Sequence, residues 1–230
     1  MSRPTIAGLM LVGLPLAFNA GFALLGARFE YPDILRRPTS EVLARFRDGG
    51  IPLMLIWWAF MLTAVLLAPA VVLLAAAIGD ADGTLLAVGT VVGVLASTVQ
   101  FLGLVRWPFL VPYLARVDAD PSASPARREA VDVVFQSFNR YLGVGVGEHL
   151  GYALTGAWTT LAGAALTQTA EVPSWLGVVG LAIGPALMLS SLEFVGRVGD
   201  RGWIVAERLT PIAYIAWSVW LIAVGIGLLV

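Results

Sequence analysis

The sequence contains no cysteine and no lysine, and His149 is its only histidine. Without cysteine the chain cannot form disulfides, thiolate nucleophiles, iron–sulfur clusters or Cys-based zinc sites. Without lysine it cannot form a Schiff base, which excludes a retinal linkage and a lysine nucleophile. A single histidine cannot supply a bis-histidine haem or a multi-histidine metal site. We therefore expect neither a metal nor another cofactor.

Charged residues are also scarce. They make up 13% of the chain, against about 25% in a typical soluble domain. Hydrophobic residues make up 59%, and the mean hydropathy is +0.87. This composition predicts an integral membrane protein whose first partner is the lipid bilayer. The net charge of −1 and the pI of about 5.8 give no reason to expect a nucleic acid as partner.

Six apolar segments are long enough to cross about 30 Å of hydrocarbon as helices. They lie near residues 5–27, 51–78, 84–115, 141–167, 174–197 and 208–230. We therefore predict an all-α polytopic bundle of six transmembrane helices, with short amphipathic helices on the cytoplasmic side. Residues 1–230 are expected to form a single membrane domain.

The arginines are distributed unevenly between the loops. One side of the predicted membrane has only Arg3, whereas the loops after the first, third and fifth segments hold twelve arginines. These are Arg28, Arg36, Arg37, Arg45 and Arg47, then Arg116, Arg127, Arg128 and Arg140, then Arg197, Arg201 and Arg208. By the positive-inside rule the odd-numbered loops are cytoplasmic. Both termini are then expected outside.

Two cytoplasmic loops are expected to contain helices. In the first loop, Thr39 is predicted as the N-cap of a short helix that Gly49-Gly50 ends. In the third, apolar residues at helical spacing between Pro125 and Arg140 predict an amphipathic helix. It could lie on the membrane surface, pack under the bundle or run into the fourth span. Anchoring is the simpler interpretation of both helices, and docking of a partner is the alternative.

The segment from Arg140 to Trp158 combines features that rarely occur together in a span. Gly143, Gly147 and Gly151 share one helix face, which predicts close packing against another helix. Glu148 and His149 follow within the same span, and ionisable groups in a membrane usually face a partner or a polar cavity. Glu148 lies eight residues after Arg140, or about 12 Å in from the cytoplasmic end.

Other polar residues are expected at a similar depth, and they define the candidate ligand or proton site. The candidates are Arg106, Glu148, His149, Asn19 and Tyr214, with Glu193 nearer the surface. One interpretation is a buried Arg106–Glu148 ion pair that fixes helix register. The other is a polar cavity, open to the cytoplasm, in which Glu148 or His149 binds a solute or a proton.

Tryptophans and one proline add detail to the predicted spans. Trp57, Trp58, Trp175 and Trp203 lie near predicted span ends and are expected to anchor at the membrane interface. Trp107, Trp158, Trp217 and Trp220 are expected to pack inside the bundle. Pro108 predicts a helix break directly beside Arg106.

Three stretches of the sequence together resemble a bacterial family of polytopic membrane proteins known as a domain of unknown function. They are Tyr31–Arg36 (YPDILR), Arg106–Phe109 (RWPF) and Gly147–Gly151 (GEHLG). The resemblance covers nearly the whole chain and implies that Arg106, Glu148 and His149 share one signature with the Tyr31-Pro32-Asp33 motif. It implies a bacterial cytoplasmic (inner) membrane and no established activity.

Three functions remain open from the sequence. The leading hypothesis is small-solute or proton-coupled transport, or ligand binding, at the buried polar residues. The second is an accessory or sensory subunit that docks a partner through Tyr31–Arg47 and Pro125–Arg140, and a second copy of the chain is a further candidate partner. The third is a lipid-modifying enzyme with Glu148 and His149 as acid and base, which is disfavoured because no nucleophile–base set is apparent.

Overall fold

The computed structural model describes residues 2–195 and 203–230, and every regular element in this part of the chain is a helix. The first four elements are α1 (Arg3–Phe29), the 3₁₀ helix η1 (Asp33–Arg36), α2 (Thr39–Ala77) and α3 (Gly83–Leu104). They are followed by α4 (Arg106–Phe109), α5 (Val111–Asp118), α6 (Pro125–Phe138) and the π-helix η2 (Asn139–Leu150). The last are α7 (Gly151–Leu166), α8 (Ser174–Ser190), the 3₁₀ helix η3 (Ser191–Phe194) and α9 (Ile204–Gly227). The prediction of an all-α helical membrane protein is confirmed.

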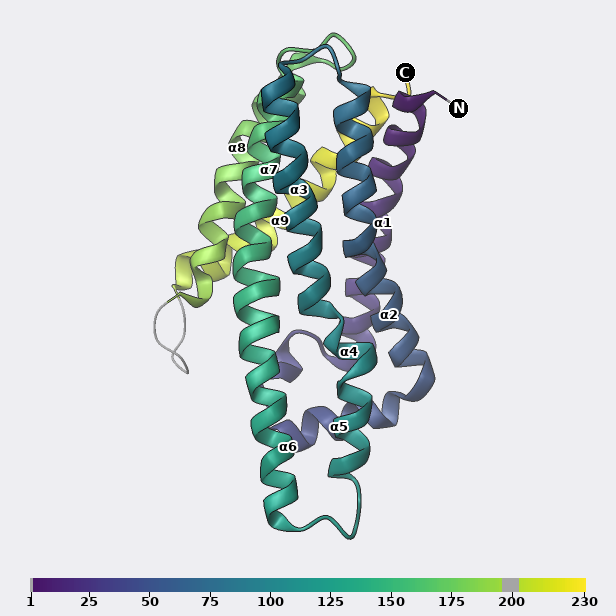
Figure 1. Ribbon diagram of the computed structural model, residues 1–230, viewed down its shortest axis with the longest axis vertical. Helices are drawn as coiled ribbons and strands as arrows, with labels where there is room; N and C mark the ends of the chain where they lie inside the picture. Colours follow the sequence, from purple (N-terminus) through teal and green to yellow (C-terminus); the bar gives the residue numbers. More distant parts are fainter. Residues whose placement is uncertain (1, 196–202) are drawn as a thin grey trace.

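Five helices of the described chain are long and apolar enough to cross a membrane. They are Arg3–Phe29, Thr39–Ala77, Gly83–Asp118, Trp175–Phe194 and Ile204–Gly227. The predicted fourth span is divided between η2, of 12 residues, and α7, of 16 residues. In Figure 1, α6 and α7 are joined in one long, unbroken rod.

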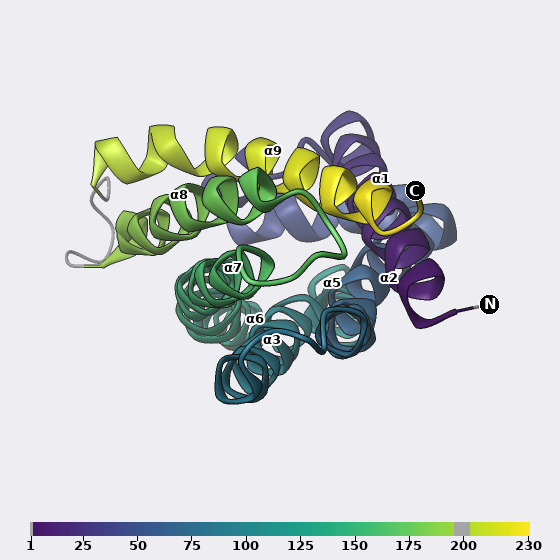
Figure 2. The same ribbon diagram turned by 90° about the horizontal axis from the view of Figure 1, so that it is seen from above.

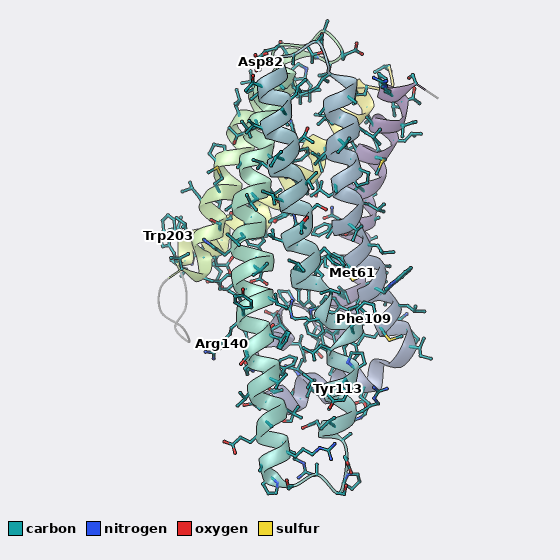
Figure 3. All side chains as sticks on the ribbon, in the orientation of Figure 1. Met61, Asp82, Phe109, Tyr113, Arg140 and Trp203 are labelled. Atoms are coloured by element: carbon teal, nitrogen blue, oxygen red, sulfur yellow. The ribbon has the colours of Figure 1, made fainter. Side chains whose placement is uncertain are left out.

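The long helices form a closed ring, as the view along the bundle shows (Figure 2). Each of α1, α2, α3, α7, α8 and α9 contacts the next, and α9 returns to α1. Both termini lie at the same end of the bundle as the α2–α3 and α7–α8 connections (Figure 1). Asp82 marks that end, whereas Tyr113 and Arg140 lie in the opposite half (Figure 3).

In the half that contains the termini, glycines bring helices into backbone contact. A Cβ atom on Gly163 of α7 would lie 2.8 Å from the carbonyl oxygen of Gly177 on α8. A Cβ atom on Gly8 of α1 would lie 2.7 Å from the carbonyl oxygen of Gly225 on α9. Only glycine fits such contacts, which hold membrane helices together by van der Waals packing.

The opposite half has an aromatic core. The indole rings of Trp57 and Trp107 stack with centroids 4.2 Å apart and an interplanar angle of 8°. Phe29 packs edge-on against both rings. The prediction that Trp57 anchors at the interface is wrong, because its side chain is fully buried. Trp58, in contrast, is 45% exposed.

The two amphipathic helices predicted in the loops are present and contact each other. Gly50, with a φ of 56°, interrupts α2 and separates its amphipathic first part from the long apolar part. Thr39 is not the N-cap as predicted: Pro38 holds that position, and Thr39 is the first helical residue. The Thr39 hydroxyl instead donates to Asp132 and accepts from Gln136 at 2.9 Å, which ties α2 to α6. Of the three placements considered for the second helix, α6 runs directly into η2.

Candidate functional site

The glycine face of η2 and α7 lies against α3. Gly143 packs on Arg106, Gly147 on Gly103, and Gly151 on Gln100. The contact between Gly147 and Gly103 joins two backbones, and a Cβ atom on Gly147 would lie 2.9 Å from Cα of Gly103. η2 is a π-helix. This element is rare in proteins, and where it occurs it is often at a functional site. Its glycines therefore hold the segment that carries Glu148 directly on α3.

Arg106 is buried at the start of α4, just after the end of α3, with 7% of its surface exposed. Its guanidinium donates to the carbonyl oxygen of Gly103, one of the last carbonyls of α3, and to Oδ1 of Asn139 at 3.1 Å. Its Cζ also lies 5.3 Å from the ring centroid of Trp107. No described carboxylate lies within 4.0 Å of it, so the Arg106–Glu148 ion pair considered from the sequence is not formed. The helix-end carbonyl of Gly103 and the side-chain amide of Asn139 take the place of a carboxylate beside Arg106.

Tyr31, in the loop after α1, folds back toward Glu148 and Arg106. Its ring packs edge-on against Trp57, with centroids 5.0 Å apart. Burial raises the pKa of the Tyr31 phenol above its ordinary value, the negative charge of Glu148 raises it further, and the positive charge of Arg106 lowers it. The phenol therefore lies within reach of both charges and remains a neutral hydrogen-bonding group.

Two further tyrosines lie near the same carboxyl. Tyr152 follows Glu148 by four residues and so shares its helix face. Its ring lies 5.1 Å from that of Tyr214 on α9, measured between centroids. Both hydroxyls are within range of the charge of Glu148, which is itself half-buried. We call Arg106, Glu148, Tyr31, Tyr152 and Tyr214 the Glu148 cluster.

Two other predicted site residues, His149 and Glu193, face different neighbours. The Nδ1 atom of His149 lies 2.6 Å from the carbonyl oxygen of Ser191 in η3. Glu193 accepts a hydrogen bond of 3.0 Å from the Thr210 hydroxyl. Because His149 is held by a backbone carbonyl of η3, an acid–base pair of Glu148 and His149 on one substrate is not favoured.

Asn19 is engaged between α1 and α9. Its amide nitrogen donates to the carbonyl oxygen of Pro15 at 2.7 Å and to the Ser218 hydroxyl at 3.0 Å. Pro15 precedes Asn19 by one helical turn. The Asn19 amide therefore makes one hydrogen bond within α1 and one between α1 and α9. Equal depth along the spans thus did not bring Asn19 into hydrogen-bond contact with Arg106.

Sequence reasoning missed two members of the cluster and one of its supports. Tyr152 could have been found from its spacing, because residues four apart lie on one helix face. Tyr31 was assigned to a docking loop, and no periodic pattern shows that a loop returns to a span. Asn139 ended the amphipathic helix without any sign that its amide would bind Arg106.

The chemistry of the cluster follows from its groups. The Glu148 carboxyl interacts electrostatically with one guanidinium and three phenols. The carboxyl can bind or release a proton, and the guanidinium and phenols can donate hydrogen bonds. In the described part of the chain, no three His, Cys, Asp or Glu side chains are placed to hold a metal ion. The arrangement is therefore suited to binding a proton or a small polar group.

The comparisons with known proteins agree with the motif resemblance. A family model described as "Domain of unknown function (DUF4386)" matches residues 6–225. No curated protein and no solved structure matches the chain. Since the match covers nearly all of the ring of helices and the whole Glu148 cluster, the chain belongs to the DUF4386 family.

Proposed function

We propose that this chain is a six-span protein of the bacterial cytoplasmic membrane in which the Glu148 cluster binds a proton from the cytoplasm and couples it to the passage of a small solute. The sixth span in this proposal is η2 together with α7. Both termini are outside and the odd-numbered loops cytoplasmic. The positions of the termini (Figure 1) and Asp82 at one end and of Arg140 toward the other (Figure 3) support this orientation.

One observation carries the proposal: the surroundings of Glu148. Its half-buried carboxyl interacts electrostatically with three tyrosines contributed by a loop and two helices, and with Arg106, which forms no salt bridge with it. An ion pair that only fixed register would hold the two charges together. A carboxyl kept apart from its nearest cation and surrounded by neutral phenols can gain or lose a proton without breaking a salt bridge.

The test is proton flux in proteoliposomes that contain a pH-sensitive dye. After a pH jump, we expect the wild-type protein to speed the equilibration of internal pH. Glu148→Gln keeps the shape of the side chain but cannot ionise, and we expect it to abolish this acceleration. Glu171→Gln is the control, because Glu171 is exposed in the α7–α8 connection at the opposite end of the bundle and lies outside the cluster. Equal flux through wild type and Glu148→Gln would refute the proposal.

The exposed face of α6 favours a second candidate function, an accessory or sensory subunit. Val133 is 58% exposed, Val134 36% and Phe138 42%, on a helix that extends beyond the end of α8. Such an apolar face suits a partner, either another membrane protein or a second copy of this chain. Crosslinking from native membranes through position 134 tests it. A stoichiometric partner would support docking, and crosslinks to lipid alone would exclude it.

A further inference from the structure

Two buried indoles beside Arg106 have no hydrogen-bond acceptor. The side chains of Trp57 and Trp107 are fully buried, and the Nε1 atom of each lacks an acceptor in the described part of the chain. Their rings stack with centroids 4.2 Å apart, and Cζ of Arg106 lies 5.3 Å from the ring centroid of Trp107. Burying a donor without a partner costs free energy, and such groups are rare in folded proteins. Two of them in adjacent rings indicate an acceptor that the side chains do not supply.

The Arg106 guanidinium has no negative partner in contact. Its Nη1 donates to the carbonyl oxygen of Gly103, and its Nη2 donates to Oδ1 of Asn139 at 3.1 Å. Each of these nitrogens carries a second hydrogen. Both acceptors are neutral, and no described carboxylate forms a salt bridge with Arg106. A buried cation without an anion in contact is costly, so a negative ligand would be stabilised here.

The side chains that surround the two indoles offer no acceptor either. The rings of Phe29, Phe46 and Phe135 pack on that of Trp107, with centroids 5.4, 6.2 and 6.4 Å away. Arginine and tryptophan side chains are donors only. A water molecule brings hydrogens of its own, which need acceptors that these rings lack. An anion accepts hydrogen bonds and donates none, so it matches this set of groups better than water.

The number of cations sets the charge of the ligand. One guanidinium balances one negative charge, and a second negative charge would be buried without a partner. The ligand must also lose its hydration shell to reach donors that are fully buried, and this costs less for a monovalent anion than for a divalent one. The groups beside Arg106 therefore favour a compact anion that carries a single charge.

We propose that Arg106, Trp107 and Trp57 form a binding site for a compact monovalent anion such as chloride, and that such an anion is the solute of the transport proposed above. The guanidinium supplies the charge, and the indole N–H groups supply hydrogen bonds to the anion. Arginine is among the residues that select anions in membrane pores. The identification of the anion as the solute rests on the proposed function, whereas its binding does not.

The binding test is thermal unfolding of the wild-type protein in detergent. Chloride replaces gluconate, an anion too bulky for a fully buried site, at constant ionic strength and pH. A ligand of the folded state raises the Tm as its concentration rises. We expect a saturable increase of about 2–4 °C in chloride. Equal Tm values in chloride and gluconate at every concentration would overturn the proposal.

Four variants identify the groups that bind the anion. Arg106→Met should abolish the effect of chloride on the Tm. Trp107→Phe and Trp57→Phe keep a ring for the stack and remove one N–H each, and we expect each to need about tenfold more chloride for the same increase. Trp58→Phe is the matched control, because Trp58 is 45% exposed, and it should respond as wild type does. An unchanged response in Arg106→Met, or in both variants of the stacked pair, would refute the site.

Proton flux in proteoliposomes separates this inference from the proposed function. We expect wild-type flux to be faster in chloride than in gluconate, because an anion that accompanies the proton prevents a build-up of charge. If chloride raises the Tm but leaves flux unchanged, the anion is not the solute. If chloride has no effect on the Tm while Glu148→Gln abolishes flux, the anion site is refuted and the proton site stands. If Glu148→Gln leaves flux unchanged while chloride acts on the Tm through Arg106, the proposed function fails and the anion site stands.

Discussion

The two halves of the bundle differ in the side chains that they bury. In the half that contains the termini, helices meet at glycines such as Gly163 and Gly8, and the core is mainly aliphatic, with three tryptophans. In the opposite half, a buried arginine lies beside stacked tryptophans, and a carboxyl interacts electrostatically with three tyrosines. The half with the termini can exclude water without burying ionisable side chains. The second buries groups that cost free energy and that a purely structural bundle does not need.

This difference indicates that the functional groups lie in the half with the buried polar side chains. Close glycine packing makes a tight barrier to ions without using any ionisable side chain. The polar groups then lie on one side of that barrier, within reach of the cytoplasm in the proposed orientation. We therefore expect substitutions in the half with the termini to lower stability, and substitutions at the polar groups to lower proton flux.

The largest contrast is expected from Arg106→Met. Methionine keeps much of the side-chain length and removes a buried charge that lacks a carboxylate in contact. Replacing buried charges by apolar groups is often neutral or stabilising, so we expect an unfolding free energy within about 1 kcal/mol of wild type or above it. Proton flux should fall at least about tenfold, because the cation that acts on Glu148 is gone. A strongly destabilised Arg106→Met protein with normal flux per folded molecule would contradict the account.

The opposite signature is expected from Gly163→Ala. The added methyl group would lie 2.8 Å from backbone atoms of α8, so the helices must separate. Overpacking of this kind costs about 1–3 kcal/mol, measured as unfolding free energy in detergent. The control is Gly13→Ala, where a Cβ atom meets nothing within 4 Å. Flux per folded molecule should stay near wild type in both variants, and equal stability of the two would contradict the role given to the glycine contacts.

The smallest effect is expected at the α2–α3 connection. The Thr169 hydroxyl donates to Asp80 at 2.6 Å, and this hydrogen bond lowers the pKa of Asp80 below its ordinary value of 3.8. A lowered pKa in the folded state gives stability that is present above 3.8 and is lost as the pH falls through the folded value. Thermal unfolding across acidic pH should show a weaker dependence in Asp80→Asn than in wild type, because the variant keeps only the contribution of groups such as Asp120, whose pKa is also lowered. If the stability of the two proteins changed with pH in the same way, Asp80 would not contribute to the acid dependence of stability.

The fold was largely predictable because its main signal is composition. Long apolar segments, the Pro108 break and the Gly50 interruption all follow from local residue chemistry. Trp57 was misplaced because a tryptophan near a span end can face lipid or the core, and only the partner ring of Trp107 decides. Thr39 was taken for an N-cap because the sequence could not show that Asp132 and Gln136 lie beside its hydroxyl.

The candidate site was predictable only in part, for a similar reason. Depth along a helix locates Arg106 and Glu148 in one layer, but helix rotation decides which side chains meet. Asn19 lies at a comparable depth and is used between α1 and α9 instead. Tyr31 enters from a loop whose return path no period in the sequence describes. Distances across the bundle depend on the ring arrangement, which is not encoded in any single span.

The most direct test of the central claim is infrared spectroscopy of the full-length protein in lipid bilayers. We expect a carboxylic acid band that disappears in Glu148→Gln and persists in Glu193→Gln. Its intensity should change reversibly with pH, and its frequency should shift in deuterium oxide, because a proton site exchanges with water. A spectrum in which no Glu148-dependent band responds to either change would contradict the account.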